Sequence, residues 1–186
     1  MDGRSRRLRR ATSMLALATV LLTACGGTDT DDEPDSAVSL DVAEDWTRSD
    51  PEVTAEVLES LRWAPARDDG SSLQVIVGCG EDTTAEELLQ GAARGERPVV
   101  GTADEPATVE VEGLDDAQQV TFALGRSEQD VRAWMAGLYG TADGVLVLVE
   151  YTRPHARFSE SEANEILGSV TVDTSEAAEQ CETAEE

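Results

Sequence analysis

Hydrophobic and polar positions alternate along the chain in two rhythms, one typical of helices and one typical of strands. Three segments carry apolar residues at helical spacing behind an Asp, Thr or Ser that suits a helix N-terminus. These predicted helices cover residues 51–63, 84–95 and 159–168. The last two also predict a capping box, with Glu86 or Glu87 three residues after a threonine and Glu162 three residues after Ser159. Continuous or alternating apolar runs predict strands at residues 73–77, 109–112, 120–124, 145–151 and 169–172.

Residues 131–139 fit both rhythms, because four of their apolar side chains also lie at helical spacing. We predict a strand here, since residues 140–144 indicate a hairpin turn directly before the strand at 145–151. The order is then strand, helix, a run of antiparallel strands, helix and strand. That order predicts an α+β fold, in which helices flank an antiparallel sheet.

The first 25 residues follow the order of a bacterial lipoprotein signal, with five arginines, an apolar run and then Leu22-Thr23-Ala24-Cys25. As a helix, the apolar run at residues 11–22 would span about 18 Å, against roughly 30 Å for the hydrocarbon core of a bilayer. We therefore predict that residues 1–24 are removed and that a diacylglyceryl group is attached to Cys25. The mature chain would be anchored to the cell membrane on its extracytoplasmic face.

Beyond the signal, the sequence divides into three parts. Residues 25–39 are polar and acidic and predict a flexible tether. Residues 40–173 hold the predicted helices and strands and form a single domain, and the acidic tail at 174–186 is expected to be tether-like. Acidic residues of the tether resemble a calcium loop, but Pro34 stands where such a loop needs glycine. We expect no metal and no cofactor.

Charge is strongly one-sided, because the sequence has 39 acidic residues, 14 arginines and no lysine. Removal of the signal takes away five arginines and Asp2, so 38 acidic and nine basic side chains remain, a net charge of −29. Such a surface repels nucleic acid, whose phosphates must be neutralised by basic groups. It gives no help in adhering to anionic lipid either, so attachment would depend on the acyl chains of Cys25.

Cys79 and Cys181 are the two cysteines that remain once Cys25 is lipidated. In an oxidising compartment, a disulfide between them is the default expectation. It would close a loop of about 100 residues, which the chain-entropy relation values at roughly 4.7 kcal/mol. A CxxC motif is absent, and two cysteines with one distant histidine make a poor zinc set.

Candidate chemistry is sparse, and the only histidine lies in Arg153-Pro154-His155-Ala156-Arg157. One interpretation is an anion-binding patch of Arg153, His155 and Arg157 that takes a carboxylate or phosphate. The other is a solvated loop between a strand and a helix. No serine has the setting of an elbow nucleophile, and no phosphate loop is present. We therefore expect no catalytic residues, and we expect the three tryptophans in the core or at its rim.

Three stretches carry a likeness to a known family: strand 73–77 with the capped helix after it, the hairpin at 109–114, and strand 145–150 leading to helix and strand at 159–170. In the order of these patterns, the mature chain resembles the actinobacterial lipoproteins of the LpqN type, whose domain belongs to the PsbP-like α/β/α sandwich group. The resemblance implies a non-enzymatic envelope protein that binds or helps to place other envelope components. It offers no catalytic residues. The predicted helix near residue 50 and the Cys79/Cys181 pair depart from the family pattern.

These observations predict a membrane-anchored binding or accessory module of the cell envelope, without enzymatic activity. Its partners would be the membrane, through the lipid on Cys25, and envelope proteins or lipids. One alternative is a carrier of a lipid or another amphiphile, which would need an apolar cavity of a few hundred Å³. A second alternative is an envelope hydrolase, which the missing nucleophile setting disfavours.

Overall fold

The computed structural model describes residues 36–51, 57–80, 82–95 and 98–184. The predicted signal, Cys25 and most of the predicted tether lie outside these residues. Within the described ranges, none of the helices has the length and apolar character that crossing a membrane requires.

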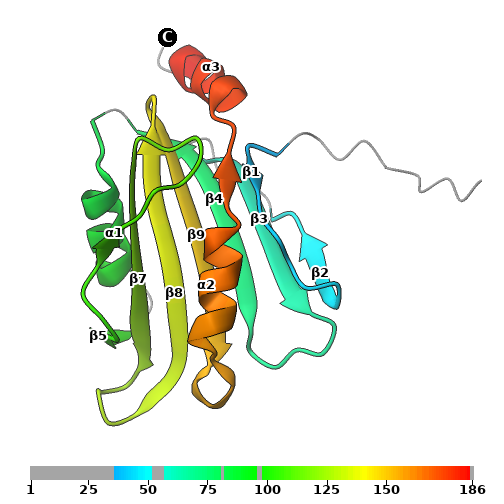
Figure 1. The fold of residues 1–186 in the computed structure, drawn as a ribbon, viewed down its shortest axis with the longest axis vertical. Coiled ribbons are helices and arrows are strands. Elements are labelled where there is room, and N and C mark those ends of the chain that lie inside the picture. The colour runs from blue at the N-terminus through cyan, green and yellow to red at the C-terminus, as the bar shows by residue number, and fades with distance from the viewer. Residues whose placement is uncertain (1–35, 52–56, 81, 96–97, 185–186) are drawn as a thin grey trace, which may run out of the picture. The chain divides into compact units, whose positions relative to one another are not determined.

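In the described part of the chain, an antiparallel sheet of eight strands forms the centre of the domain. Seven strands follow the order β2-β3-β4-β9-β8-β7-β5 (Figure 1), and β6 pairs with β7. The short strands β1 (Val38–Ser39) and β10 (Thr171–Val172) pair with each other outside this sheet. The strands of the sheet are β2 (Trp46–Ser49), β3 (Val57–Pro65), β4 (Ser72–Cys79), β5 (Val99–Thr102), β6 (Ala107–Thr108), β7 (Asp116–Gly125), β8 (Val131–Ala142) and β9 (Val145–Pro154).

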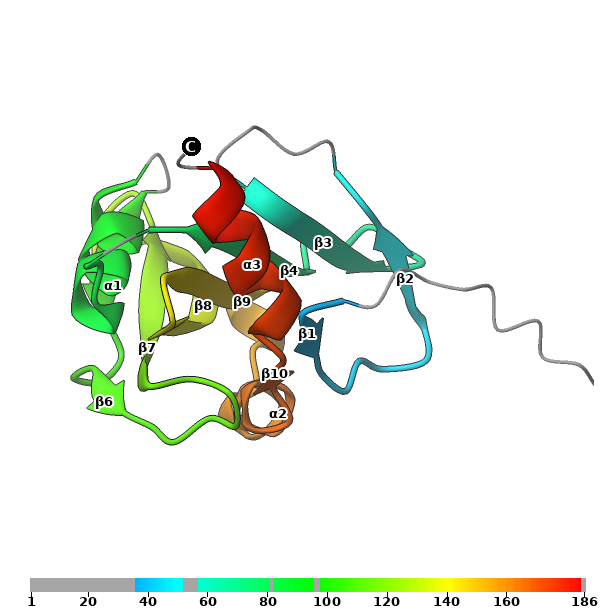
Figure 2. The ribbon, with the colours of Figure 1, turned by 90° about the horizontal axis from the view of Figure 1, so that it is seen from above.

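Helices lie on both faces of the sheet. Successive residues of a strand point to opposite faces, and in β8 both sets of residues are apolar and pack against helices. Met135 and Tyr139 of β8 pack in a core with Leu89 of α1 (Ala85–Arg94). Ala136 and Leu138 of the same strand belong to a second core, together with apolar residues of α2 (Glu160–Gly168) and α3 (Ser175–Ala184). Figure 2 shows the resulting α/β/α arrangement from above.

The predicted α+β fold is confirmed, and so are two of its helices. Thr84 accepts a hydrogen bond from the backbone N–H of Glu87, whose side chain returns one to Thr84, so the predicted capping box begins α1. Ser159 likewise accepts from the backbone N–H of Glu162 at the start of α2. Strands β4, β7 and β9 contain the predicted runs at 73–77, 120–124 and 145–151, and residues 131–139 form a strand as preferred.

The predicted helix at 51–63 is wrong where the structure describes it. Residues 52–56 lie outside the described residues, but Val57–Pro65 is the strand β3. Leu61 is buried opposite Val75 of β4, and β2 pairs along the other edge. The apolar residues therefore serve a sheet face at spacing two, and partner strands from elsewhere in the sequence decide the outcome.

The second half differs from the prediction in three smaller ways. Residues 109–112 are not a strand of the sheet. The strand that pairs with β7 at this point is β6, which ends at Thr108, and Glu112 makes an isolated bridge to Thr171. The hairpin turn is shorter than expected, because β8 continues to Ala142 and Asp143-Gly144 alone make the turn. The closing strand is the short β10, which pairs with β1 and not with the main sheet.

The acidic tail is also not tether-like within its described residues. Ser175–Ala184 form α3, whose start is held by Asp173, which accepts hydrogen bonds from the backbone N–H of Ser175 at 3.1 Å and from its hydroxyl at 2.5 Å. The tether expectation fails at its other end too, where Val38–Ser39 belong to β1. Ordered structure thus extends beyond both ends of the domain predicted at 40–173.

Candidate functional site

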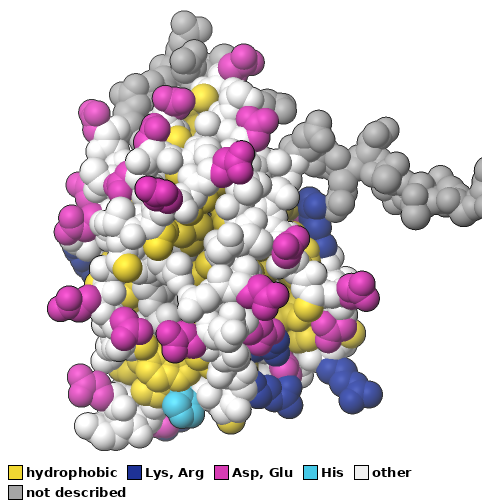
Figure 3. Space-filling model, in the orientation of Figure 1, with side chains coloured by type: hydrophobic (Ala, Val, Ile, Leu, Met, Phe, Trp, Pro, Cys, Tyr) yellow, Lys and Arg dark blue, Asp and Glu magenta, His cyan; other side chains and the backbone are white. Residues whose placement is uncertain are grey.

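Four segments border a pocket at one end of the sheet. They are the chain before and at the start of β2, the link between β3 and β4, the end of β9 with the short 3-10 helix η1 (His155–Arg157), and the first turn of α2. Figure 3 shows arginine side chains gathered at the lower right of the face it presents, while acidic side chains are spread more widely. The pocket has a volume of about 410 Å³ and is lined by Ala43, Asp45, Trp46, Pro65, Ala66, Arg67, Asp69, Arg153, Arg157 and Glu162.

Arg153 is the most constrained charge in this pocket. Its Nε donates to the Tyr151 hydroxyl at 2.5 Å, and its Nη2 donates to Glu162 Oε1 at 2.5 Å. The guanidinium also lies 5.2 Å from the ring centroid of Trp46 and 5.6 Å from that of Tyr151, within the range of a cation–π contact. Only 16% of the Arg153 side chain is exposed, so we consider Arg153, Glu162, Tyr151 and Trp46 the fixed floor of the pocket.

Protonation of the floor follows from these contacts. Partial burial lowers the pKa of Arg153, but the hydrogen bonds to Tyr151 and Glu162 outweigh it and hold that pKa above its usual value. Burial raises the pKa of the Tyr151 hydroxyl, which therefore stays protonated at neutral pH. Arg153 is consequently a permanent cation here.

Asp69 holds the second arginine at the rim. The connection between β3 and β4 turns at Gly70, which has a φ of +81°, and this turn brings Asp69 toward η1. Asp69 accepts a hydrogen bond from the backbone N–H of Ser71 at 2.9 Å and forms an ion pair with Arg157. The Nη1 of Arg153 lies 3.9 Å from the same carboxylate. Hydrogen bonding from Ser71 and then the Arg157 pair lower the pKa of Asp69, so its negative charge persists into acid.

His155 lies apart from the two arginines that flank it in the sequence. Trp134 Nε1–H donates to His155 Nδ1 at 2.7 Å, and the two ring centroids are 6.0 Å apart. Phe158 packs on Trp134 at 6.2 Å. Because Nδ1 accepts in this contact, the neutral ring carries its proton on Nε2. The predicted patch thus divides: Arg153 and Arg157 share the pocket, whereas His155 joins an aromatic cluster beside it.

The pocket carries no net charge, since three arginines and three carboxylates line it. Sequence reasoning found Arg153 and Arg157 but missed Asp69, and it assigned Glu162 only to helix capping. No local pattern distinguishes these carboxylates from the other acidic residues of the chain, of which there are 39 in all. Trp46 was expected in the core or at its rim, and it lies half-buried against Tyr151.

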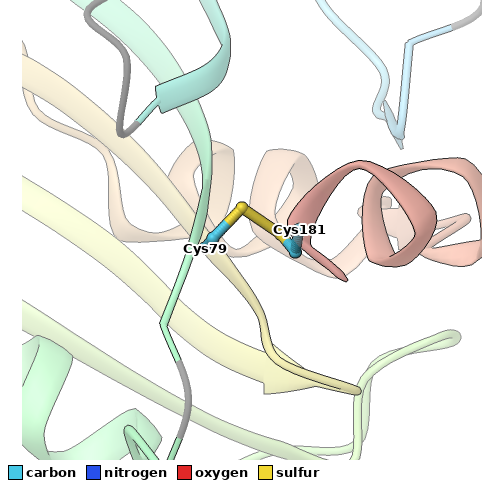
Figure 4. The surroundings of a disulfide bond; sticks show 2 residues. All are labelled: Cys79 and Cys181. Carbon is cyan, nitrogen blue, oxygen red and sulfur yellow. A yellow bond between two sulfur atoms is a disulfide. The ribbon is translucent and has the colours of Figure 1, made fainter. Parts of the chain in front are cut away.

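The opposite end of the sheet contains the disulfide that the sequence predicts. Cys79 at the end of β4 is bonded to Cys181 of α3, with a Cα–Cα distance of 5.4 Å (Figure 4). A second hollow, of about 510 Å³, opens near the start of α3 and is lined by Ser36, Ala37, Ser39, Glu112, Asp143, Thr171, Val172, Asp173, Thr174 and Ser175. In the described ranges, no cluster of three His, Cys, Asp or Glu side chains is placed to hold a metal ion.

Comparison with known proteins supports the fold. No family model matches the sequence, and no curated protein matches it. The structure is similar to the solution structure of the cyanobacterial PsbP protein CyanoP from Synechocystis, with a TM-score of 0.56 at 12% identity, over 74% of this chain and 87% of that one. LpqN of Mycobacterium tuberculosis, described as involved in cell envelope biogenesis, gives a TM-score of 0.47 at 14% identity, over 73% and 82% of the two chains. At these identities the likeness to CyanoP shows a PsbP-like fold.

Proposed function

We propose that this chain is a lipoprotein of the extracytoplasmic face of the membrane, and that its domain works there as a non-enzymatic binding module. The lipid on Cys25 holds it to the membrane, and the pocket around Arg153 receives another component of the envelope. The observation that carries the binding role is the fixed floor of this pocket, where an arginine is held in one position between Glu162, Tyr151 and Trp46.

A fixed arginine favours recognition, because less side-chain freedom is lost when a ligand binds. The pocket volume of about 410 Å³ lies in the range of small-molecule sites. By contrast, the surroundings of His155 do not favour catalysis. Its Nδ1 already accepts from Trp134, and Cys79 is in a disulfide and is no nucleophile.

The compartment is supported by two independent features. The residues ahead of Cys25 follow the order of a lipoprotein signal. The Cys79–Cys181 disulfide suits an oxidising environment, in which such bonds persist. Charged side chains make up much of the lining of the Arg153 pocket, and charged and hydroxyl side chains border the hollow near α3, so neither hollow favours the amphiphile carrier over the binding module.

Labelling with a fatty-acid analogue tests the anchor. We expect the full chain expressed in bacterial cells to incorporate the label and to sediment with membranes. The Cys25→Ser variant should lose both properties, while the control variant Cys79→Ser/Cys181→Ser should keep the label. Label retained on Cys25→Ser, or membrane residence without label, would contradict the lipoprotein assignment.

A substrate screen tests the non-enzymatic role. The purified lipidated protein is offered ester, glycoside, peptide and phosphate substrates, with His155→Ala in parallel. We expect no turnover above background from either protein. Turnover that His155→Ala abolishes would make His155 catalytic, and turnover that it leaves intact would point to carboxylates; either result would replace the binding module by an enzyme.

A further inference from the structure

The pocket around Arg153 differs from the rest of the surface in its charge balance. The chain has a net charge of −25, yet three of its arginines meet three carboxylates around this one hollow. The charged side chains of the floor and of the rim also differ in how far they are paired and exposed. Arg153 and Glu162 neutralise each other on the floor, whereas the rim holds exposed charges of both signs.

We propose that this pocket binds a small zwitterionic group, a phosphate and an ammonium on one short chain, as in the phosphoethanolamine headgroup of an aminophospholipid. This inference rests on the proposed binding role of the pocket and names the ligand chemistry. It differs from the anion patch expected from the sequence, because the carboxylates of the pocket are part of the recognition.

The phosphate is bound by the two arginines at the rim. Arg67 is exposed and makes no ion pair within the described part of the chain. Arg157 is 62% exposed and is held by the Asp69 carboxylate. Each guanidinium has five N–H donors, so both arginines retain donors that a phosphate can accept from. Arg153 offers its Nη1 from the floor, 3.9 Å from Asp69.

The ammonium is bound by Asp45. Asp45 is exposed and has no ion-pair partner among the described residues, and it precedes Trp46 directly in the pocket lining. An exposed carboxylate that has no ion-pair partner suits a small cation, which gains a charge pair there. Asp45 and the two rim arginines thus present opposite charges to opposite ends of one ligand.

A simple anion fits this pocket less well. Three carboxylates face it, and carboxylates are ionised at neutral pH. The approach is also unfavourable, since the whole domain is acidic and repels a ligand of net negative charge. A zwitterion avoids this long-range repulsion and still pairs with charges of both signs inside the pocket.

The predicted anchor keeps the domain near such headgroups, with Ser36 at the hollow near α3 and the Arg153 pocket at the other end of the sheet. Eleven peptide units separate Cys25 from Ser36, the first described residue, and they span at most about 40 Å when fully extended. The membrane that holds the lipid on Cys25 therefore presents its headgroups to the domain at high local concentration. A weak pocket is sufficient under these conditions.

Calorimetric titration of the lipidated protein in a non-ionic detergent tests the proposal. The probes are glycerophosphoethanolamine, glycerol 3-phosphate as the anion alone, and ethanolamine as the cation alone. We expect glycerophosphoethanolamine to bind at least tenfold more tightly than either part. Vesicles with and without phosphatidylethanolamine then separate the sources: binding that requires the lipid indicates a membrane headgroup, and binding of the soluble probe only indicates a free ligand.

Three variants assign the two ends of the ligand. Asp45→Asn should weaken glycerophosphoethanolamine binding about tenfold without weakening glycerol 3-phosphate, whereas Arg67→Gln/Arg157→Gln should weaken both. Arg94→Gln is the matched control, because Arg94 is an exposed arginine of α1 that does not line the pocket.

Two results would overturn the zwitterion assignment. If glycerol 3-phosphate binds as tightly as glycerophosphoethanolamine, the pocket is an anion site, and the proposed binding role survives without the headgroup. If no probe binds, or if Arg94→Gln has the same effect as the rim variants, this ligand chemistry is wrong. The lipid label on Cys25 is measured separately, so the membrane anchor does not depend on either result.

Discussion

The two ends of the sheet are held together by different chemistry. At the α3 end, Cys79 of β4 pairs in register with Val145 of β9, and the disulfide to Cys181 joins α3 to this edge. At the η1 end, Ser72 of β4 pairs with Thr152 of β9, and the Arg153 pocket lies just beyond. Figure 1 shows α3 beyond the upper ends of β4 and β9.

The difference follows from the side chains available at each end. The described apolar contacts of α3 come from alanines and Cys181, with Ala177 and Cys181 buried. Such small side chains remove little apolar surface from water, so packing alone contributes little to holding the helix. The η1 end instead has large side chains, with Arg153 stacked on Trp46 and Tyr151. We infer that the α3 end is specialised for stability and the η1 end for recognition.

Removal of the disulfide is expected to have the largest effect. Its cysteines are 102 residues apart, and loss of a native disulfide from a small secreted domain typically costs about 2–5 kcal/mol. Cys79→Ala/Cys181→Ala should therefore lower the free energy of unfolding by about that amount, as measured by urea denaturation with circular dichroism. Native protein treated with reductant serves as the comparison and should show a similar loss.

Intact-mass measurement supplies the direct control. The native protein should gain two hydrogens on reduction. Two thiols that alkylate freely without reductant would show that the disulfide is absent. A urea midpoint unchanged by reductant would show that the disulfide does not stabilise the fold.

The disulfide was predictable from the sequence because Cys79 and Cys181 are the two cysteines left once Cys25 is lipidated. The helix that carries Cys181 was not predictable in this way. Elements with strong local patterns, such as the capping box at Thr84 and the apolar run of β9, were predicted correctly. By contrast, α3 has few apolar residues, and its place depends on a bond to a residue in β4. The strand β3 was mistaken for a helix because its partners β2 and β4 lie elsewhere in the sequence.

The pocket shows the same division between local and distant information. Arg153 and Arg157 are close in sequence, so part of the cationic cluster was visible, whereas His155 lies outside the pocket and Arg67 was not foreseen. Asp69 reaches Arg157 across 88 residues of chain, and nothing near Asp69 in the sequence distinguishes it from the other carboxylates. The neutral charge of the pocket is therefore a property of the fold, which a count of nearby residues cannot supply.

Loss of Arg153 should have the second largest effect and should be felt at the η1 end. Arg153→Met keeps much of the aliphatic volume but removes the donors to Tyr151 and Glu162. We expect a loss of about 1–3 kcal/mol in the free energy of unfolding, because hydrogen bonds to charged groups are removed from a mostly buried position. The measurement is urea denaturation of the oxidised protein.

Arg157→Gln is the matched control for Arg153→Met. Its side chain is 62% exposed, and an exposed ion pair typically contributes less than about 1 kcal/mol. Equal losses of unfolding free energy for the two variants would contradict the distinction between a buried, fixed floor and an exposed rim.

Acid titration of Asp69 gives the smallest expected effect and shows whether the rim is held by charge. Hydrogen bonding from Ser71 and the Arg157 pair lower its pKa in the folded protein, so the ionised form is the one that stabilises the fold. That contribution is complete above the unfolded pKa, about 3.9, and is lost as the pH falls through the lower folded value. Asp69→Asn should therefore lower the urea midpoint at pH 6 and have a smaller effect at pH 3. Asp104→Asn, at an exposed position that does not line the pocket, controls for the general effect of acid on this chain. A difference between Asp69→Asn and native protein that stays the same at both pH values would mean that shape, and not charge, holds Asp69 in the pocket.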